Sequence, residues 1–440
     1  MKKYPTLLSL YLAQSIPMSF FSTIVPVIMR QEKYSLAMIG LLQLIKLPWI
    51  FKFLWAPLVD KYGNSEANYK RWVFGSEFVY AAIIISIGFL NLQFNFPLII
   101  TLMVIAFIAS ATQDIATDAF AILVLKKEER SMGNAMQSAG TFLGTMTGSG
   151  ILLIMYHYFG WQGLMFCLAG FVVLAIIPLY FYKNNKENET AKSPTDASCH
   201  GHHSHKLLKL KDSDQNKASF KDIGLFFRQK GIWRRIVLLF FFYSGIIGIL
   251  SLMKPFLVDN GFTMKQIGII SGICGTASGA ISSIIGAHLI RRIGRKRSLY
   301  LFASFSVLTG LFFVWLLSGH LQHFQLYTAV VFLWISYGMS SVGIYTISMD
   351  IVRKGREGTD FTIQIVITHL SALLITIACG KLADMLGFRT LFVIETVFAV
   401  AVLASIQFLY RENLSDLVIS DSGVADEDTV ISEKIHKTGS

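Results

Sequence analysis

Charged side chains are scarce in this 440-residue sequence. Asp, Glu, Lys and Arg account for 15% of it, whereas hydrophobic residues account for 53%. A soluble domain has about 25% charged residues, and a soluble chain of this length would form about three domains. The composition excludes that organisation and favours a single polytopic membrane protein.

Cysteine is also rare, and three of the four residues, Cys167, Cys274 and Cys379, lie in apolar stretches. No disulfide framework is implied, and we interpret these three as small residues of an apolar core. The sequence contains no Walker A motif, no HExxH motif and no GxSxG motif in a credible context. We therefore expect no ATP hydrolysis, no enzyme active site and no cofactor.

A histidine-rich tract, CHGHHSH at residues 199–205, has the composition of a metal-binding segment. Tight metal sites need a fixed geometry with supporting contacts around the ligands. This tract lies in a polar stretch rich in Lys, Asn, Ser and Asp, which is typical of a flexible linker. We interpret it as solvated chain and expect no metal site, with weak adventitious metal binding as the alternative.

Apolar runs of about 20 residues, long enough to cross a bilayer, recur along the chain. Six precede the polar stretch and six follow it, so we expect both termini on the same side of the membrane. The predicted spans are 6–29, 36–57, 72–92, 97–125, 133–157, 161–182, 233–258, 264–290, 298–318, 324–352, 361–382 and 389–410.

Lys and Arg are distributed unevenly between the two sides of these spans. If both termini are cytoplasmic, 31 of the 39 Lys and Arg residues fall in cytoplasmic segments and 5 fall on the opposite side. The positive-inside rule therefore predicts cytoplasmic termini. This distribution also excludes nucleic acid as the reason for the net charge of +12.

These patterns predict an all-α polytopic membrane protein with 12 transmembrane helices in two six-helix bundles. The expected divisions are an N-terminal bundle (1–182), a cytoplasmic linker (183–232), a C-terminal bundle (233–412) and a disordered acidic cytoplasmic tail (413–440).

The two halves of the sequence repeat one another. An offset of 227 residues aligns Gln137 with Gln364, and it also aligns GWQGLMF (160–166) with GFRTLFV (387–393). Two parallel repeats imply a substrate path where the two bundles meet, with its polar site near the bilayer midplane.

Two predicted spans carry charges that cost about 2.5–3.5 kcal/mol each at the centre of a bilayer. Lys46 and Lys52 lie in the second span, and Gln113, Asp114 and Asp118 lie in the fourth, within the run ASATQDIATDAF. Asp114 and Asp118 share a helix face because they are four residues apart. At about 1.5 Å per residue, Lys46 and Asp114 have matching depths, with Lys52 and Asp118 as a second tier nearer the cytoplasm.

We predict that these five residues line a substrate and proton pathway, in which Asp114 or Asp118 takes up and releases a proton. A nearby lysine lowers the pKa of a carboxyl and burial raises it, so a change of partner could couple proton and cargo. A static ion pair that joins the second and fourth spans is the alternative.

Other polar residues of the spans suit structural roles. Glu77, Lys254 and Glu395 lie close enough to span ends to snorkel toward the interface. For His369 we favour a buried histidine with its hydrogen bonds satisfied.

Asp350 shortly precedes Arg353 and Arg356, which predicts an interfacial salt bridge. The glycine-rich runs TFLGTMTGSG (141–150) and SGICGTASGA (271–280) place small residues three and four apart, a spacing that lets helix backbones approach closely.

The six-plus-six layout, the parallel repeat and the loops DKYG and RRIGRKR resemble those of a major facilitator superfamily transporter. The resemblance implies two bundles with a path between them and a role for Asp60 in latching them on the cytoplasmic side. Gly63, Gly294 and Arg295 belong to the same two loops, and we assign these four residues to a cytoplasmic gate.

The segments LPWIFKFLWAPLVDKY (47–62), ASATQDIATDAF and REGTDFTIQ (356–364) together resemble the AmpG-like permease and acetyl-CoA transporter group. Members of that group import muropeptides or siderophores, or export acetyl-CoA. In its number of spans the chain is similar to the RhtX/FptX-type siderophore importers. The resemblance carries over as functional positions Lys46, Lys52, Asp60, Gln113, Asp114 and Asp118.

We therefore expect a monomeric, proton-coupled secondary importer of a polar solute such as a siderophore, working by alternating access in the cell inner membrane. Its expected partners are a small-molecule substrate, protons and the lipid bilayer, and not nucleic acid. An AmpG-like muropeptide permease is an alternative, and a transporter-derived membrane sensor is another.

Overall fold

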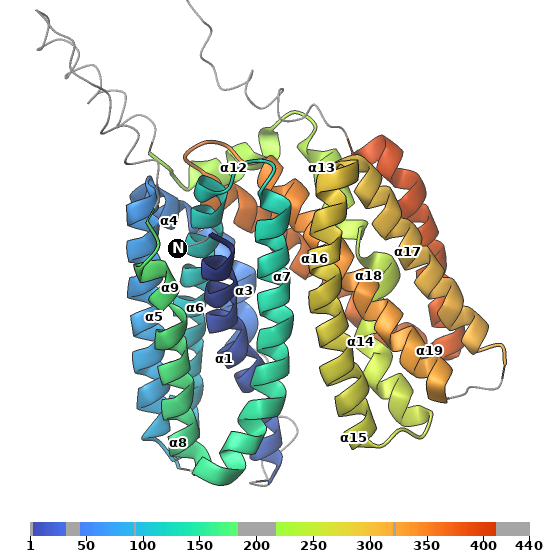
Figure 1. Cartoon of the computed structure of the whole chain (residues 1–440), viewed down its shortest axis with the longest axis horizontal. Helices are drawn as coiled ribbons and strands as arrows, with labels where there is room; N and C mark the ends of the chain where they lie inside the picture. The colour runs from blue at the N-terminus through green and yellow to red at the C-terminus, as the bar shows by residue number, and fades with distance from the viewer. Residues whose placement is uncertain (1–2, 32–44, 92–93, 184–216, 320–322, 411–440) are drawn as a thin grey trace, which may run out of the picture.

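The structure is a computed structural model that describes residues 3–31, 45–91, 94–183, 217–319 and 323–410. Within these ranges every regular element is a helix, and the helices form two groups that lie side by side (Figure 1). A helix satisfies its own backbone hydrogen bonds, which is what a segment surrounded by lipid requires. The all-helical class is thereby confirmed.

The N-terminal group consists of α1 (Lys3–Gln31), α3 (Leu47–Phe51), the 3₁₀ turn η2 (Lys52–Leu54), α4 (Ala56–Gly63), α5 (Glu66–Gly88), α6 (Phe96–Val124), α7 (Arg130–Met146), the π-helical turn η3 (Thr147–Ile151), α8 (Leu152–Ala175) and α9 (Ile177–Tyr180).

The C-terminal group consists of α12 (Lys221–Arg228), α13 (Ile232–Phe241), α14 (Ser244–Asp259), α15 (Met264–Ile267), the π-helical segment η4 (Gly268–Gly275), α16 (Thr276–Ile293), α17 (Arg295–Leu316), α18 (His323–Asp350) and α19 (Glu357–Leu409).

The helices follow the order of the predicted spans. Eight helical stretches of the described residues are long and apolar enough to cross a membrane. One of them, α19, covers the last two predicted spans because it bends at Gly387. The other predicted spans correspond to α1, to the broken segment α3–η2–α4, and to α7 with η3.

The internal repeat is visible in the backbone at its aligned glycines. Gly160 bends α8 with φ 63° and ψ −169°, and Gly387 bends α19 with φ 76° and ψ 164°. Positive φ is a conformation that glycine adopts without steric cost, so each glycine allows one helix to end and the next to begin. The two bends occupy corresponding places between the fifth and sixth spans of each half.

The run TFLGTMTGSG (141–150), together with Gly140 just before it, allows α7 to lie directly against α1. A Cβ atom built on Gly140 would stand 2.8 Å from Cβ of Tyr11 and 3.1 Å from the carbonyl oxygen of Leu8. One on Gly144 would stand 2.5 Å from Cβ of Ser15. The backbones therefore approach closely, as the glycine spacing predicts.

The two groups meet along α7, which packs on α16 and α18, and along α19, which packs on α4 and α6. Phe142 of α7 contacts Trp334 and Tyr337 of α18, with ring centroids 5.8 Å and 5.7 Å apart. The ribbons of the two groups diverge toward the end opposite α12 (Figure 1).

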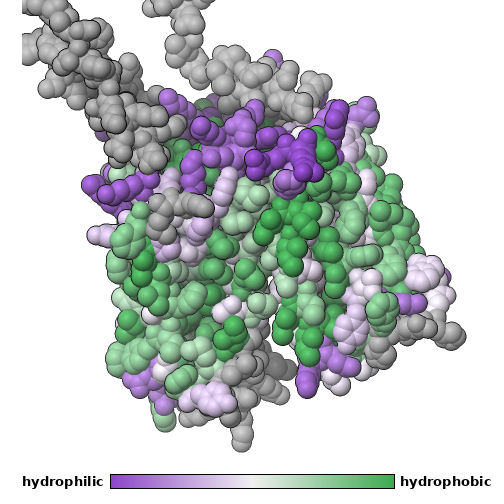
Figure 2. Space-filling model, viewed as in Figure 1, coloured by the Kyte–Doolittle hydropathy of each residue, from purple (hydrophilic) through white to green (hydrophobic). Residues whose placement is uncertain are grey.

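Polar residues form a band at one end of the molecule, and a wide apolar belt lies below it (Figure 2). We call this end the basic face; Lys61, Arg71, Arg130, Arg295 and Arg353 lie there, at helix termini and in connecting loops. The basic face corresponds to the predicted cytoplasmic side, and that orientation stays a prediction.

The described end of the linker is folded, in contrast to the expected flexible chain through residue 232. Phe226 of α12 is fully buried in a cluster with Ile232 and Ile363. The helix α12 is amphipathic, and through Phe226 it packs against the rest of the C-terminal group. The histidine-rich tract and the acidic tail lie outside the described residues.

The interpretation of the cysteines as core residues holds for Cys379, which is buried. It is wrong for Cys167 and Cys274, which are exposed on the helix surface. Apolar helices of this fold expose much of their surface, so an apolar neighbourhood in sequence does not indicate burial.

Candidate functional site

Two carboxyl groups lie inside the N-terminal group, on one face of α6. Asp114 is 3% exposed and Asp118 is 1% exposed. They are one helical turn apart, as their spacing predicts. Both therefore need hydrogen-bond or charge partners, since an isolated buried carboxylate is strongly disfavoured.

The partner of Asp114 is Lys52, which is fully buried. The lysine Nζ donates to Oδ2 of Asp114 and also lies 4.8 Å from the centre of the Trp49 ring. The predicted pairing of Lys46 with Asp114 by depth is therefore wrong. Lys46 lies half-buried at the start of α3.

The depth argument failed because it assumed one straight helix through the second span. The chain instead passes from α3 into the 3₁₀ turn η2 and then into α4, and Lys52 is the first residue of that turn. A 3₁₀ turn rises about 2.0 Å per residue and changes side-chain directions. Trp55, just after the turn, fixes it to α6 by donating to Thr112 Oγ1 at 3.1 Å.

The second carboxyl, Asp118, is held by uncharged donors. The Tyr11 hydroxyl donates to Asp118 Oδ1 at 2.6 Å, and Gln137 Nε2 donates to the same oxygen at 3.2 Å. Gln14, one turn from Tyr11 on α1, donates to Asp114 Oδ1 at 2.9 Å. The site thus joins α1, the second span, α6 and α7.

Sequence reasoning missed Tyr11 and Gln14 as site residues. The sequence did contain a pattern that could have indicated them. Tyr11 and Gln14 are three residues apart, so they place two hydrogen-bonding side chains on one face of a mostly apolar helix. Gln137 entered the sequence argument through the repeat, and the structure places it on Asp118.

Gln113 is fully buried, and neither its amide nitrogen nor its amide oxygen has a hydrogen-bond partner among the described residues. The hydroxyl of Thr117 on the same helix is in the same situation. Buried polar groups are normally hydrogen-bonded, so such atoms indicate that water or a ligand supplies the partner.

Two side chains of the C-terminal group approach this site. Tyr345 of α18 lies within electrostatic range of Asp114 and Asp118, and His369 of α19 lies within range of Lys52 and Asp114. Both are half-buried. His369 therefore lies near the charged site. The sequence alone indicates only a buried histidine and no connection with that site.

At the basic face, Asp60 joins α4 to the first turn of α19. Its carboxylate accepts hydrogen bonds from the backbone N–H groups of Gly358 and Thr359 at 2.9 Å and 2.7 Å, from the Thr359 hydroxyl at 2.6 Å, and from the Tyr69 hydroxyl at 2.7 Å. A carboxylate at a helix N-terminus is also favoured by the helix dipole. Burial raises the pKa of Asp60, and the hydrogen bonds from Thr359 and Tyr69 oppose that rise.

A second contact between the halves is centred on Asp350 at the end of α18. Arg130 of α7 donates to Asp350 Oδ1 at 3.1 Å, and Arg295 of α17 contacts both carboxylate oxygens. Arg295 also donates to the carbonyl oxygen of Lys127 at 2.7 Å. Asp350 therefore links the N-terminal half to the C-terminal half through two arginines.

The predicted salt bridge of Asp350 is present, but its partners are Arg130 and Arg295 and not the arginines that follow it. Arg353 instead pairs with Asp360, at 2.6 Å, and Arg356 pairs with Asp222 of α12 at 2.8 Å. The loop before α19 turns these side chains away from the end of α18. Arg356 thus ties the linker helix to the loop that leads into the Asp60 contact.

The two glycines of the predicted gate have different roles. Gly294 has φ 84° and separates α16 from α17, which places Arg295 at the start of a helix. Gly63 has no such conformation, and its Cα instead lies under the ring of Tyr69, where a Cβ would clash. Gly63 therefore allows Tyr69 to reach Asp60.

Glu77 and Glu395 do not snorkel as expected. Glu77 of α5 is fully buried, and neither carboxyl oxygen has a partner among the described residues. Glu395 of α19 is also buried, and it accepts from the Gly248 backbone N–H at 3.0 Å and from the Cys379 thiol at 3.2 Å. A helix bundle surrounds both positions, so their distance from a span end was a poor guide to exposure.

No group of three or more potential metal ligands occurs among the residues that the structure describes. The polar site contains carboxylates, a lysine, amides and a phenol. It holds opposite charges at close range in a buried setting, and it contains polar atoms free for a ligand or water. Groups of these kinds can bind polar solutes and exchange protons.

The sequence matches the Major Facilitator Superfamily over residues 7–376, and the chain belongs to this family. It is therefore a multi-pass membrane protein and a secondary transporter, not an enzyme. Among its relatives, an anhydromuropeptide permease of Escherichia coli (strain K12) is 25% identical over 398 residues, which cover 90% of this chain and 77% of the relative.

A putative transporter AmpG 3 of Rickettsia prowazekii (strain Madrid E) is 24% identical over 425 residues, which cover 93% of this chain and 95% of the relative. In the solved structures, a proton:xylose symporter of the same superfamily has a TM-score of 0.67 with 10% sequence identity. That likeness covers 94% of this chain and 97% of the symporter, and at this identity it shows the fold alone. The resemblance to AmpG-like permeases is thereby confirmed as a distant relationship.

Proposed function

We propose that the protein imports a muropeptide-type solute across the cell inner membrane by alternating access, coupled to protons. The observation that carries the proposal is the buried Lys52–Asp114–Asp118 group beside the interface between the halves. The relative named as an anhydromuropeptide permease supports this cargo better than the siderophore that the number of spans suggested.

The side chains around the path suit a sugar–peptide cargo. A muropeptide presents hydroxyl, amide and carboxylate groups, and the amide of Gln113 can donate to and accept from such groups. Lys52 is the cation placed to meet a carboxylate of the cargo, if the cargo competes with Asp114 for it. Phe142, Trp334 and Tyr337 offer an aromatic surface at the interface for the sugar ring.

Proton coupling follows from the charge balance of the site. Two carboxyl groups share one lysine among the described residues, and Asp118 is held by a phenol and an amide. Two carboxylates one helical turn apart in a buried site favour the uptake of one proton. Binding of an anionic cargo to Lys52 would leave Asp114 without its cation and favour a second protonation.

Alternating access requires the contacts at the basic face to break. Asp60 holds α19 through three hydrogen bonds from Gly358 and Thr359, and Asp350 holds α7 through Arg130. Each contact joins charged or helix-terminal groups that water can solvate equally well once it enters. These two contacts therefore form a gate at the predicted cytoplasmic side, with Asp60, Gly63, Gly294 and Arg295 as its parts.

The test is uptake of a labelled anhydromuropeptide into proteoliposomes under an imposed proton gradient. We expect accumulation that a protonophore abolishes, and loss of accumulation in Asp114→Asn. Asp259→Asn is the matched control, because Asp259 is an exposed acid at the end of α14. Binding of the muropeptide without accumulation would favour a transporter-derived membrane sensor. Accumulation of a ferric siderophore in place of the muropeptide would show that the proposed cargo is wrong.

A further inference from the structure

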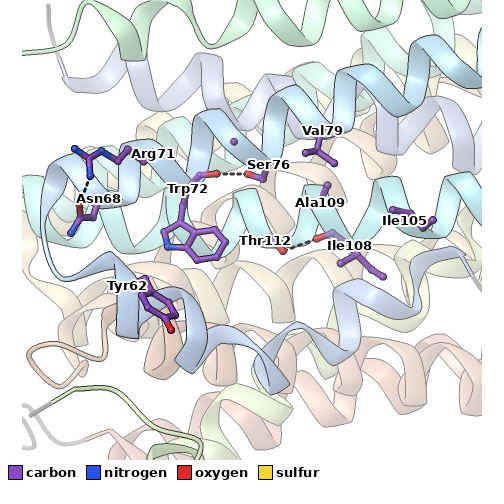
Figure 3. A pocket seen from close by; sticks show the side chains of 11 residues that line it. Tyr62, Asn68, Arg71, Trp72, Ser76, Val79, Ile105, Ile108, Ala109 and Thr112 are labelled. Atoms are coloured by element: carbon purple, nitrogen blue, oxygen red, sulfur yellow. Dashed lines mark hydrogen bonds between the residues drawn. The ribbon is translucent and has the colours of Figure 1, made fainter. Parts of the chain in front are cut away.

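A cavity of about 610 Å³ opens on the side of the N-terminal group, between α4, α5 and α6 (Figure 3). It is separate from the charged site. Its α6 wall is made by residues 105, 108, 109 and 112, which form one stripe of the helix, whereas Asp114 is about 200° around the axis from Thr112. The cavity therefore faces away from the transport path, toward the surrounding bilayer.

The cavity is polar at one end and apolar at the other. Tyr62, Asn68 and Arg71 lie at the end next to the basic face, and Val79, Ile105 and Ile108 lie at the other end (Figure 3). At about 1.5 Å per residue along α5, Arg71 lies about 8 Å and Val79 about 20 Å from Glu66, where the helix begins. This range matches one leaflet of a bilayer whose hydrocarbon core is about 30 Å thick.

The Ser76 and Thr112 hydroxyl groups in the middle of the cavity donate hydrogen bonds to the backbone of their own helices. Ser76 donates to the carbonyl oxygen of Trp72 at 2.7 Å, and Thr112 donates to that of Ile108 at 2.8 Å (Figure 3). Ser76 and Thr112 therefore offer no free hydroxyl donor to a sugar or a peptide. Gly75 adds open space, since a Cβ built there would meet no atom within 4 Å. This lining suits a hydrocarbon chain.

The mouth of the cavity is cationic. Arg71 is exposed, and its guanidinium contacts the side-chain oxygen of Asn68 at 3.5 Å. Lys61 lies near the same mouth, with Nζ 5.6 Å from the centre of the Tyr62 ring. Neither forms a salt bridge with a carboxylate among the described residues, whereas the neighbouring Glu66 pairs with Lys70. Arginine is well suited to bind a phosphate group at such a position.

We propose that this cavity binds one anionic phospholipid of the leaflet at the basic face. The phosphate lies at Arg71 with Lys61 nearby, and one acyl chain runs along Gly75 and Val79 between α5 and α6. The apolar part of the cavity, the shaft around Gly75 and Val79, favours a lipid over a soluble anion. The positive charge at the mouth favours an anionic headgroup over a zwitterionic one.

The test is native mass spectrometry of the purified full chain titrated with phosphatidylglycerol or phosphatidylcholine, with crosslinking by a photoreactive phosphatidylglycerol to locate the bound lipid. We expect tighter binding of phosphatidylglycerol and crosslinks in α5 and α6. Gly75→Leu fills the shaft and removes these crosslinks. Gly170→Leu is the matched control, because Gly170 is an exposed helical glycine of α8 with equal open space.

Arg71→Ala tests the charge separately, because an exposed side chain at the end of a helix can be removed without unfolding the protein. An exposed ion pair contributes about 0.2–1 kcal/mol, so we expect phosphatidylglycerol affinity to fall about 1.4- to fivefold and its preference over phosphatidylcholine to disappear. Arg71→Lys should restore most of the preference. Crosslinks that persist in Gly75→Leu, or that Gly170→Leu removes equally, would overturn the lipid site. Equal binding of both lipids to the unmodified protein would overturn its selectivity for anionic headgroups.

Discussion

Lys52 and Asp114 form an ion pair inside the N-terminal half, although 62 residues separate them in sequence. The pair exists because η2 interrupts the second span at Lys52 and turns its side chain toward α6. Both groups have lost their hydration, so each depends on the other for its charge. Any event that separates them, such as binding of a charged solute, must supply a new partner.

Removal of one member of this pair should destabilise the fold more than removal of both. Asp114→Leu leaves Lys52 buried without a counter-charge, and we expect the free energy of unfolding to fall by about 3–5 kcal/mol. The double variant Lys52→Met/Asp114→Leu should recover most of that loss. Denaturant unfolding of the purified protein in detergent measures the difference, and equal instability of the single and double variants would contradict the prediction.

Asp118→Asn should separate proton coupling from solute binding. Asparagine keeps nearly the same shape and can still accept a hydrogen bond from Tyr11, but it cannot exchange a proton. We expect accumulation to fall to equal concentrations on the two sides of the membrane, while exchange of labelled for unlabelled solute continues. Measuring both activities in the same vesicles provides the control. Gradient-driven accumulation that persists would exclude Asp118 as the proton carrier.

The sequence predicted the helical class, the two repeats and the shared face of Asp114 and Asp118, because each depends on local periodicity or on composition. The charged site formed differently from the prediction. Depth along a straight helix matched Lys46 with Asp114. The chain is instead interrupted at η2, just before Pro57 at the start of α4, and Lys52 is the partner of Asp114.

Contacts between segments that are distant in sequence could not be predicted from the residue pattern either. Tyr11 reaches Asp118 because glycines of α7 allow α1 to approach it, and that approach depends on packing in three dimensions. Asp350 pairs with Arg130 and Arg295. It does not pair with Arg353 or Arg356, although they are only a few residues away, because the chain turns between α18 and α19. The family resemblance, in contrast, directed attention to Asp60, and the structure gives Asp60 contacts across the two halves.

Thr359→Val should weaken the contact between α4 and α19. The substitution removes the 2.6 Å hydrogen bond from the Thr359 hydroxyl to Asp60 and leaves the backbone donor in place. Loss of one bond to a buried carboxylate costs about 1–3 kcal/mol, enough to increase the population open at the basic face about tenfold. Spin-label distances between α4 and α19 report this opening.

Thr328→Val is the control for that experiment, because the Thr328 hydroxyl donates only to its own helix at Phe324. It should leave the distances unchanged. An unchanged distribution in Thr359→Val as well would show that the hydroxyl does not help to hold the halves together.

Gly140→Ala should disturb the charged site without touching a charged residue. The added methyl group would meet Tyr11 and the carbonyl oxygen of Leu8, so α1 has to move away from α7. Overpacking of this kind typically costs about 1–3 kcal/mol. The same displacement draws the Tyr11 hydroxyl away from Asp118, so we expect uptake to fall together with stability. The reference variant is Gly170→Ala, where a Cβ meets no atom and alanine in place of glycine in a helix should stabilise by about 1 kcal/mol. If Gly140→Ala is as stable and as active as Gly170→Ala, close contact between α1 and α7 does not position Tyr11.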